Sequence, residues 1–163
     1  MSDRVDALSA TARANGIRIA VAESLTCGTL AATIGKGSAA DEWFAGGVIA
    51  YQTRTKRRLL GLAPGVDPVS AACAERLTSG VRSLLEAEIG VSTTGVGGPE
   101  DQDGHPAGTV HIGWASDLGV SSRRFRFEGG PERVLEQTID AAIGILLDLT
   151  AGRAERPSGM PRS

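Results

Sequence analysis

Segments with helix-like and strand-like spacing of apolar residues alternate along the chain. Apolar positions three or four residues apart predict five helices, and short apolar or alternating runs predict five strands. The predicted helices are Asp3–Asn15, Thr26–Ile34, 53–61, Ala71–Leu85 (with Ser70 as its N-cap) and Pro131–Leu149. The predicted strands are 17–23, 44–51, 89–95, 109–115 and 122–127.

This order predicts an α/β domain with a mainly parallel sheet, because strands that alternate with helices pair in parallel. A final hairpin around residues 116–119 makes the predicted sheet mixed. Residues 122–127 alternate apolar and basic side chains, which is typical of a half-exposed edge strand. We expect residues 1–150 to form one domain. Residues 151–163 hold almost nothing to bury, so we expect a disordered tail.

Polar motifs follow three of the predicted strands. These are Glu23–Gly28, Tyr51–Lys56 and the loop that begins at Thr94. The carboxyl ends of parallel strands meet at one edge of a sheet, where ligands bind in such folds. We therefore expect the three motifs to converge on one site.

The composition is that of a globular protein and excludes several functional classes. Of the 163 residues, 41% are hydrophobic and 22% are charged, with a net charge of −2. The sequence contains no basic stripe with interleaved aromatic residues, so a nucleic-acid partner is not predicted. No apolar run is long enough to span a bilayer, and the N-terminus lacks the pattern of a signal peptide. We therefore expect a cytoplasmic protein without a membrane partner.

The cysteines and histidines do not form a metal-binding pattern. Cys27 and Cys73 are two thiols in a chain of this size, which suits a reducing compartment. His105 and His111 stand apart from both cysteines in the sequence, so no metal site is predicted. Cys27 lies near the N-terminus of a predicted helix, which would lower its pKa, and is a rival nucleophile. We expect it instead to be a small buried residue that packs the helix on the sheet.

Two interpretations of Ser24 are open. As an N-cap its hydroxyl would accept a backbone N–H of the following helix, which is the common role of such a serine. As a nucleophile it needs a neighbouring base, and no histidine follows at a suitable place. Lys56 is then the candidate base, provided that burial or the nearby Arg54, Arg57 and Arg58 lower its pKa. The alternative for Lys56 is a solvated basic helix face.

The loop TGVGGPEDQDG, residues 94–104, is rich in glycine. Its glycines allow close backbone approach to a ligand, and successive N–H groups are able to hold an anion or a developing oxyanion. The spacing is not that of a dinucleotide-binding fingerprint, a P-loop or a calcium loop.

Five segments together resemble, in order and spacing, the CinA C-terminal domain family, whose enzymes are nicotinamide mononucleotide deamidases. The segments are AESLTCGTLAATI, FAGGVIAYQTRTKRRLLGL, VSAACAERLTSGVR, TTGVGGPEDQDGHPAGTVHIGWA and FRFEGGPERVLEQTIDAAIGIL. The resemblance covers about residues 5 to 150. The family often carries this domain behind a nucleotide pyrophosphatase domain, and we expect this chain to be a stand-alone form.

The resemblance implies a three-layer α/β/α domain that hydrolyses the carboxamide of nicotinamide mononucleotide to nicotinate mononucleotide and ammonia, without a metal or organic cofactor. It implies Ser24 as the nucleophile, Lys56 as the base and Tyr51 as a third catalytic-site residue. We also expect a homodimer or a higher homo-oligomer. The expected substrate-binding residues are Glu23, Thr26, Gly28, Gly47, Thr94, Gly95, Gly97, Gly98 and Arg133.

The chain departs from the family pattern in the run GGPERVL. Gly130 and Pro131 replace an aspartate and an arginine, and Leu135 replaces a second arginine, with Arg133 as a partial substitute. Cys27 and Gln52 also differ from the commonest family residues. These departures keep an alternative function open, namely a weak or inactive homologue that binds a nucleotide or a protein.

Overall fold

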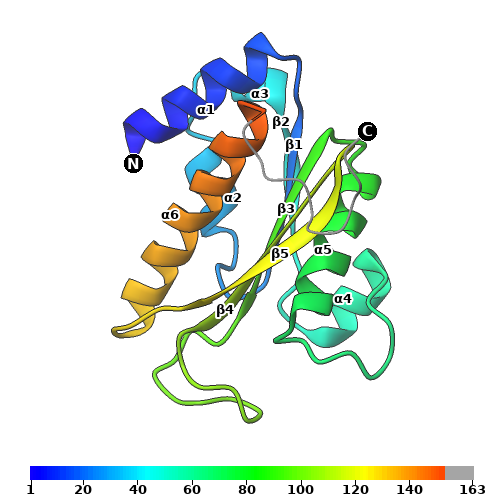
Figure 1. Cartoon of the computed structure of the whole chain (residues 1–163), viewed down its shortest axis with the longest axis vertical. Helices are drawn as coiled ribbons and strands as arrows, with labels where there is room; N and C mark the ends of the chain where they lie inside the picture. Colours follow the sequence, from blue (N-terminus) through cyan, green and yellow to red (C-terminus); the bar gives the residue numbers. More distant parts are fainter. Residues whose placement is uncertain (153–163) are drawn as a thin grey trace, which may run out of the picture.

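The computed structural model describes residues 1–152 and contains one five-stranded sheet between two layers of helices (Figure 1). The strand order is β2-β1-β3-β4-β5. The strands are β1 (Ile19–Glu23), β2 (Phe44–Ile49), β3 (Ile89–Gly95), β4 (Thr109–Ser116) and β5 (Gly119–Arg126). The predicted tail lies almost wholly in residues 153–163, outside the described residues.

The helices cover both faces of the sheet, as the three-layer prediction requires (Figure 1). They are α1 (Ser2–Ala14), α2 (Thr29–Ile34), α3 (Ala40–Trp43), α4 (Thr53–Leu60), α5 (Ala71–Leu84) and α6 (Pro131–Thr150). α1, α2, α3 and α6 pack on one face, and α4 and α5 pack on the other. The α/β/α architecture is therefore confirmed.

Two apolar cores, one on each face, hold the layers together. The larger core joins α1 and α6 to the sheet through residues such as Leu8, Ile112 and Ile143, all fully buried. The smaller core lies under α4 and α5 and contains Leu60 and Leu77. Alternate residues of β1 point to opposite faces, so every residue of this central strand is buried.

The sheet is less parallel than the sequence predicted. β1 pairs in parallel with β2 and β3, whereas β3–β4 and β4–β5 are antiparallel. The antiparallel pairing of β3 with β4 has a simple physical reason. The β3–β4 connection is the loop at residues 96–108, and without a crossover helix the chain returns antiparallel to β3.

Most helix positions were predicted, with two differences at the first crossover. α2 begins at Thr29 rather than at Thr26, and α3 was not predicted at all. Ser70 is the N-cap of α5, as predicted, because its hydroxyl accepts the N–H of Cys73. Among the helices of residues 1–152, none is both long and apolar enough to cross a bilayer.

The two crossovers open the sheet at the carboxyl ends of its central strands. The chain passes from β1 to β2 through α2 and α3 on one face, and from β2 to β3 through α4 and α5 on the other. The segments that leave β1 and β2 therefore turn to opposite faces of the sheet, which opens a crevice beyond the ends of these strands. The three polar motifs lie at this end of the sheet.

Candidate active site

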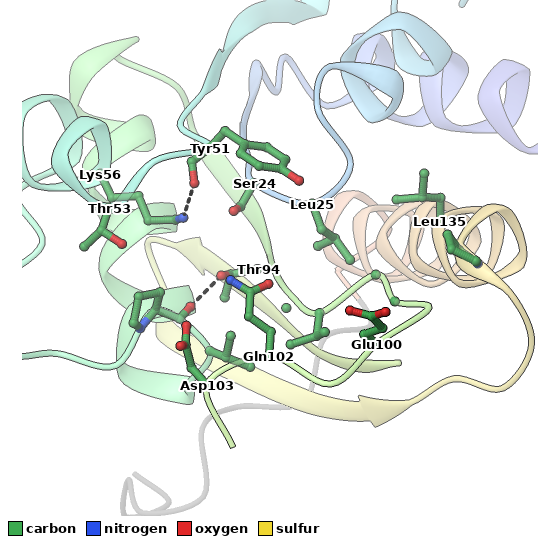
Figure 2. A pocket seen from close by; sticks show the side chains of 17 residues that line it. Ser24, Leu25, Tyr51, Thr53, Lys56, Thr94, Glu100, Gln102, Asp103 and Leu135 are labelled. Atoms are coloured by element: carbon green, nitrogen blue, oxygen red, sulfur yellow. Dashed lines mark hydrogen bonds between the residues drawn. The ribbon is translucent and has the colours of Figure 1, made fainter. Parts of the chain in front are cut away.

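A cavity of about 300 Å³ lies beyond the carboxyl ends of β1 and β3 (Figure 2). It brings together all three polar motifs, because Ser24, Tyr51, Lys56 and Thr94 line it. Five further groups complete the wall. They are Leu25 and Thr53, Pro68 and Val69, Gly95–Gly98, Glu100 with Gln102 and Asp103, and Pro131 with Leu135.

Ser24 lies in the tight turn that leaves β1. Its backbone N–H donates to the carbonyl oxygen of Thr93 at 3.0 Å, which ties the turn to β3. The N–H of Cys27 closes the turn on the Ser24 carbonyl oxygen at 3.1 Å. Ser24 is 7% exposed and its hydroxyl donates to no acceptor among residues 1–152. The N-cap interpretation is wrong, because Gly28 holds that position and α2 has no side-chain cap from Ser24.

Glu23 supplies the capping interaction that the sequence assigned to a hydroxyl. Its two carboxylate oxygens accept the N–H groups of Leu30 and Ala31, both at 2.9 Å. The first N–H groups of a helix have no partner within the helix, so a buried carboxylate there stabilises α2. Glu23 therefore holds the turn against β1 and does not itself line the cavity.

Lys56 is buried, and the solvated-face alternative is wrong. The side chain is on the inner face of α4 with Leu60, and Lys56 is 3% exposed. Its Nζ donates to the carbonyl oxygen of Tyr51 at 2.9 Å (Figure 2). Burial lowers the pKa of the Lys56 amino group below its ordinary value of 10.5, because desolvation penalises the ammonium form. The three neighbouring arginines do not contribute to this lowering.

Figure 2 shows the polar ends of Ser24 and Lys56 directed into the same space. Ser24 enters from the turn after β1, and Lys56 enters from α4. A hydroxyl that bonds to no acceptor in the described part of the chain thus shares a cavity with an amine whose pKa is lowered. This combination suits proton transfer from the hydroxyl to the amine.

The two cysteines differ in their surroundings. Cys73 is fully buried on α5, where burial raises the pKa of its thiol to about 11, against an opposing effect from Lys56. It is therefore a neutral packing residue. Cys27 was expected to be buried and is instead exposed, since it adopts a left-handed backbone conformation (φ 44°) at the tip of the turn. It does not line the cavity.

The glycine loop forms the wall opposite the turn. A side chain at Gly95 would collide with the backbone of β4, so the loop requires glycine where it leaves β3. The Thr94 hydroxyl donates to the Pro68 carbonyl oxygen at 2.6 Å, which fixes the start of the loop. The N–H groups of Gly97 and Gly98 bond to no acceptor within residues 1–152. They are free to bind a ligand.

Several expected binding residues lie outside the cavity wall. Thr26 is buried and its hydroxyl shares a hydrogen bond of 2.7 Å with that of Thr93. Gly28 and Gly47 lie beside Ile49 and Val21, where an added Cβ would collide. Arg133 is exposed and pairs with Glu136 on the outer surface of α6. Pro131 and Leu135 line the cavity, whereas Arg133 does not.

Leu25 and Thr53 lie inside polar motifs that the sequence analysis singled out, and Pro131 and Leu135 stand in the GGPERVL run. Pro68 and Val69 were missed, because no local pattern marks them and they reach the cavity from a separate segment of the chain. Among residues 1–152, no three or more His, Cys, Asp or Glu side chains form a group that could hold a metal ion.

Comparisons with known proteins agree with the geometry. The model of the CinA C-terminal domain matches residues 2–150. A CinA-like protein of Frankia casuarinae is 37% identical over 138 residues, covering 82% of this chain and 32% of its own length. A Bacillus velezensis protein that is named as competence-damage inducible is 40% identical over 149 residues, covering 89% of this chain and 36% of its own length. The chain thus spans about a third of these curated relatives.

A solved structure shares the fold. The crystal structure of a competence-damaged protein (CinA) superfamily member from Klebsiella pneumoniae superposes with a TM-score of 0.88 at 29% identity. The superposition covers 93% of this chain and 98% of that one. Family model, relatives and structure agree over nearly all the described residues, and the chain belongs to the CinA C-terminal domain family.

Proposed function

We propose that this chain is a serine–lysine amidohydrolase that converts nicotinamide mononucleotide to nicotinate mononucleotide and ammonia. The observation that carries the proposal is the shared cavity of Ser24 and the buried Lys56. The lowered pKa of Lys56 supports it, because a lysine acts as a base only in its neutral form. The substrate follows from the family resemblance. A cytoplasmic location and homo-oligomeric assembly also remain predictions.

In the first step Lys56 takes the hydroxyl proton of Ser24, and the Ser24 oxygen attacks the amide carbon. The electron pair of the C=O bond moves to its oxygen and produces a tetrahedral oxyanion. Two sets of backbone donors belong to residues that line the same cavity as Ser24. One is the N–H of Leu25 beside the nucleophile, and the other is the pair of free N–H groups at Gly97 and Gly98.

In the second step the tetrahedral intermediate breaks its C–N bond. The protonated Lys56 gives its proton to the leaving nitrogen, so that ammonia departs and an ester on Ser24 remains. Water then attacks the ester carbon while Lys56 accepts a proton from it. Collapse of this second intermediate returns the proton from Lys56 to the Ser24 oxygen and releases the product as a carboxylic acid, which loses its proton to solvent and becomes the nicotinate carboxylate. Lys56 is thus neutral at the start and at the end of each cycle.

Tyr51 is suited to hold the pyridinium ring at the cavity mouth. Its side chain is 64% exposed yet lines the cavity, and no hydrogen bond holds the phenol among residues 1–152. The pyridinium of a nicotinamide nucleotide carries a positive charge. An aromatic face attracts such a cation, and the attraction grows when the cation is partly desolvated.

The test is ammonia release from free nicotinamide, its riboside and its mononucleotide, each compared with the Ser24→Ala protein. We expect release from at least one N-ribosylated amide and none with Ser24→Ala. If no amide is hydrolysed at saturating concentration while calorimetry detects ligand binding, the chain is a binding module and the proposed amidase activity is wrong.

A further inference from the structure

The charged groups of the cavity wall are mostly negative. Among residues 1–152, Lys56 is the single cationic side chain in this wall, and it is buried at the inner end, bonded to the Tyr51 carbonyl oxygen. Glu100 and Asp103 line the outer part and are both exposed. Within residues 1–152 neither carboxylate forms an ion pair. A ligand that extends out of the cavity therefore meets two unpaired carboxylates.

The start of α6 does not compensate for these charges. A helix N-terminus attracts anions through its free N–H groups. Here the first helical residue is Pro131, which has no N–H, and Glu132 adds a carboxylate to the first turn. Arg133 is paired with Glu136 on the outer surface. The α6 residues that reach the cavity, Pro131 and Leu135, carry no charge.

We propose that this cavity selects a cationic pyridinium carboxamide without a phosphate, such as nicotinamide riboside, over the phosphorylated mononucleotide. The inference rests on the proposed amidase chemistry and changes its preferred substrate from the mononucleotide to the riboside that lacks the phosphate. A phosphate monoester carries nearly two negative charges at neutral pH. At the cavity mouth those charges would face Glu100 and Asp103 without a free cation to bind them. The pyridinium cation, which both ligands contain, is attracted by the carboxylates and by the Tyr51 ring, so the phosphate alone distinguishes the two ligands.

The first experiment compares kcat/KM for the riboside and the mononucleotide at low ionic strength. We expect the riboside to be preferred by about tenfold, since a like charge a few ångströms away changes binding several-fold even in water. Added salt screens this repulsion, so the preference should shrink as ionic strength rises. A preference for the mononucleotide at low salt would overturn the selectivity while leaving the amidase proposal intact.

Neutralising variants identify the residues responsible. We expect the double variant Glu100→Gln, Asp103→Asn to raise kcat/KM for the mononucleotide several-fold and to leave the riboside equal or poorer. Asp117→Asn is the matched control, because Asp117 is an exposed carboxylate in the β4–β5 turn, outside the cavity wall. An equal rise in the control, or no rise in the double variant, would contradict the assignment.

Binding to the Ser24→Ala protein separates failure of selectivity from failure of catalysis. Calorimetry with the riboside and the mononucleotide requires no turnover, and we expect the riboside to bind more tightly. Leu135→Arg adds a cation to the wall and should reverse this order, whereas Leu135→Gln should not. If neither amide is hydrolysed but the riboside still binds more tightly, only the amidase proposal fails. Tighter binding of the mononucleotide to Ser24→Ala would overturn the selectivity.

Discussion

The inner end of the cavity and its mouth are built in different ways. At the inner end, Ser24, Lys56 and Thr94 are almost fully buried, and each is held by a hydrogen bond to backbone of another segment or of its own loop. At the mouth, Tyr51 and Glu100 are exposed and form no side-chain hydrogen bond within residues 1–152. Ser24 and Thr94 lie at strand ends, and Lys56 lies within α4. Glu100 belongs to the long β3–β4 loop.

This difference separates the chemistry from the selectivity. Groups that exchange a proton need fixed positions and low solvent access, which strand ends with backbone bonds provide. Groups that choose between substrates act over a longer range and tolerate exposure. Substitutions at the inner end should therefore reduce kcat, and those at the mouth should change KM and substrate preference.

Replacing Ser24 should have the largest effect. Ser24→Ala removes the nucleophile, so kcat should fall by about a thousandfold or more, without loss of folding. The measurement is single-turnover ammonia release together with circular dichroism. Cys27→Ala is the control, because that thiol is exposed and outside the cavity wall. Full activity of Ser24→Ala, or inactivation by Cys27→Ala, would reassign the nucleophile.

Replacing Lys56 should have the next largest effect. Lys56→Met removes the base but keeps the apolar stem, so kcat should fall about a hundredfold to ten-thousandfold. Lys36→Met is a matched control, since Lys36 is exposed and is the other lysine of the chain. Equal losses in both variants would show that the effect of Lys56→Met is not specific to the base.

Removing the Glu23 carboxylate should mainly lower the free energy of unfolding. Glu23→Ala leaves the N–H groups of Leu30 and Ala31 without their acceptor, so the free energy of unfolding should fall by about 2–3 kcal/mol. Urea denaturation measures this change. Glu75→Ala, which removes an acceptor bonded to the hydroxyl of Ser122, should cost less. An unchanged urea midpoint for Glu23→Ala would exclude the capping role.

The value of kcat/KM should rise by up to tenfold per pH unit below the pKa of Lys56. The folded pKa of Lys56 lies below 10.5, so kcat/KM should rise as pH increases and level off before pH 10.5. The same lowered pKa means that the unfolded chain binds more protons between the two pKa values, so this group makes stability rise with pH there. The Lys56→Met protein should lack this contribution to the rise of stability with pH. A level kcat/KM from pH 6 to pH 9 would argue against a lysine base.

Truncating Tyr51 should have the smallest effect. Tyr51→Ala removes a ring from the cavity mouth, and KM for a pyridinium substrate should rise about fivefold with little change in kcat. Tyr51→Phe keeps the aromatic face and should behave like the unaltered protein. A fall in kcat in both variants would show that the phenol oxygen, rather than the ring, takes part in the reaction.

Local patterns in the sequence were enough to predict most of the fold. Strands and helices have different apolar periods, so five strands and the principal helices were identified, and the rule that polar loops meet at strand ends brought Ser24, Tyr51, Lys56 and Thr94 to one cavity. The short α3 was missed because four residues are too few for a helical period.

Other features depend on contacts between residues far apart in sequence. Burial of Lys56 follows from the packing of α4 against α5 and the sheet, and no local pattern distinguishes it from its exposed neighbours Arg57 and Arg58. The Glu23 carboxylate reaches α2 rather than a ligand only because the turn folds back on β1. The cationic substitute expected at Arg133 points away because helix geometry rotates it about 200° from Pro131.

Local sequence is sufficient to predict most strands and helices, since these depend on apolar periodicity and turn chemistry over a few residues. It is also sufficient to predict which polar groups stand at strand ends. Which of these groups share a cavity, which are desolvated and which are already hydrogen-bonded depends on how distant segments pack. Those properties depend on how close distant segments lie and on how much solvent reaches them, and no local sequence pattern specifies either.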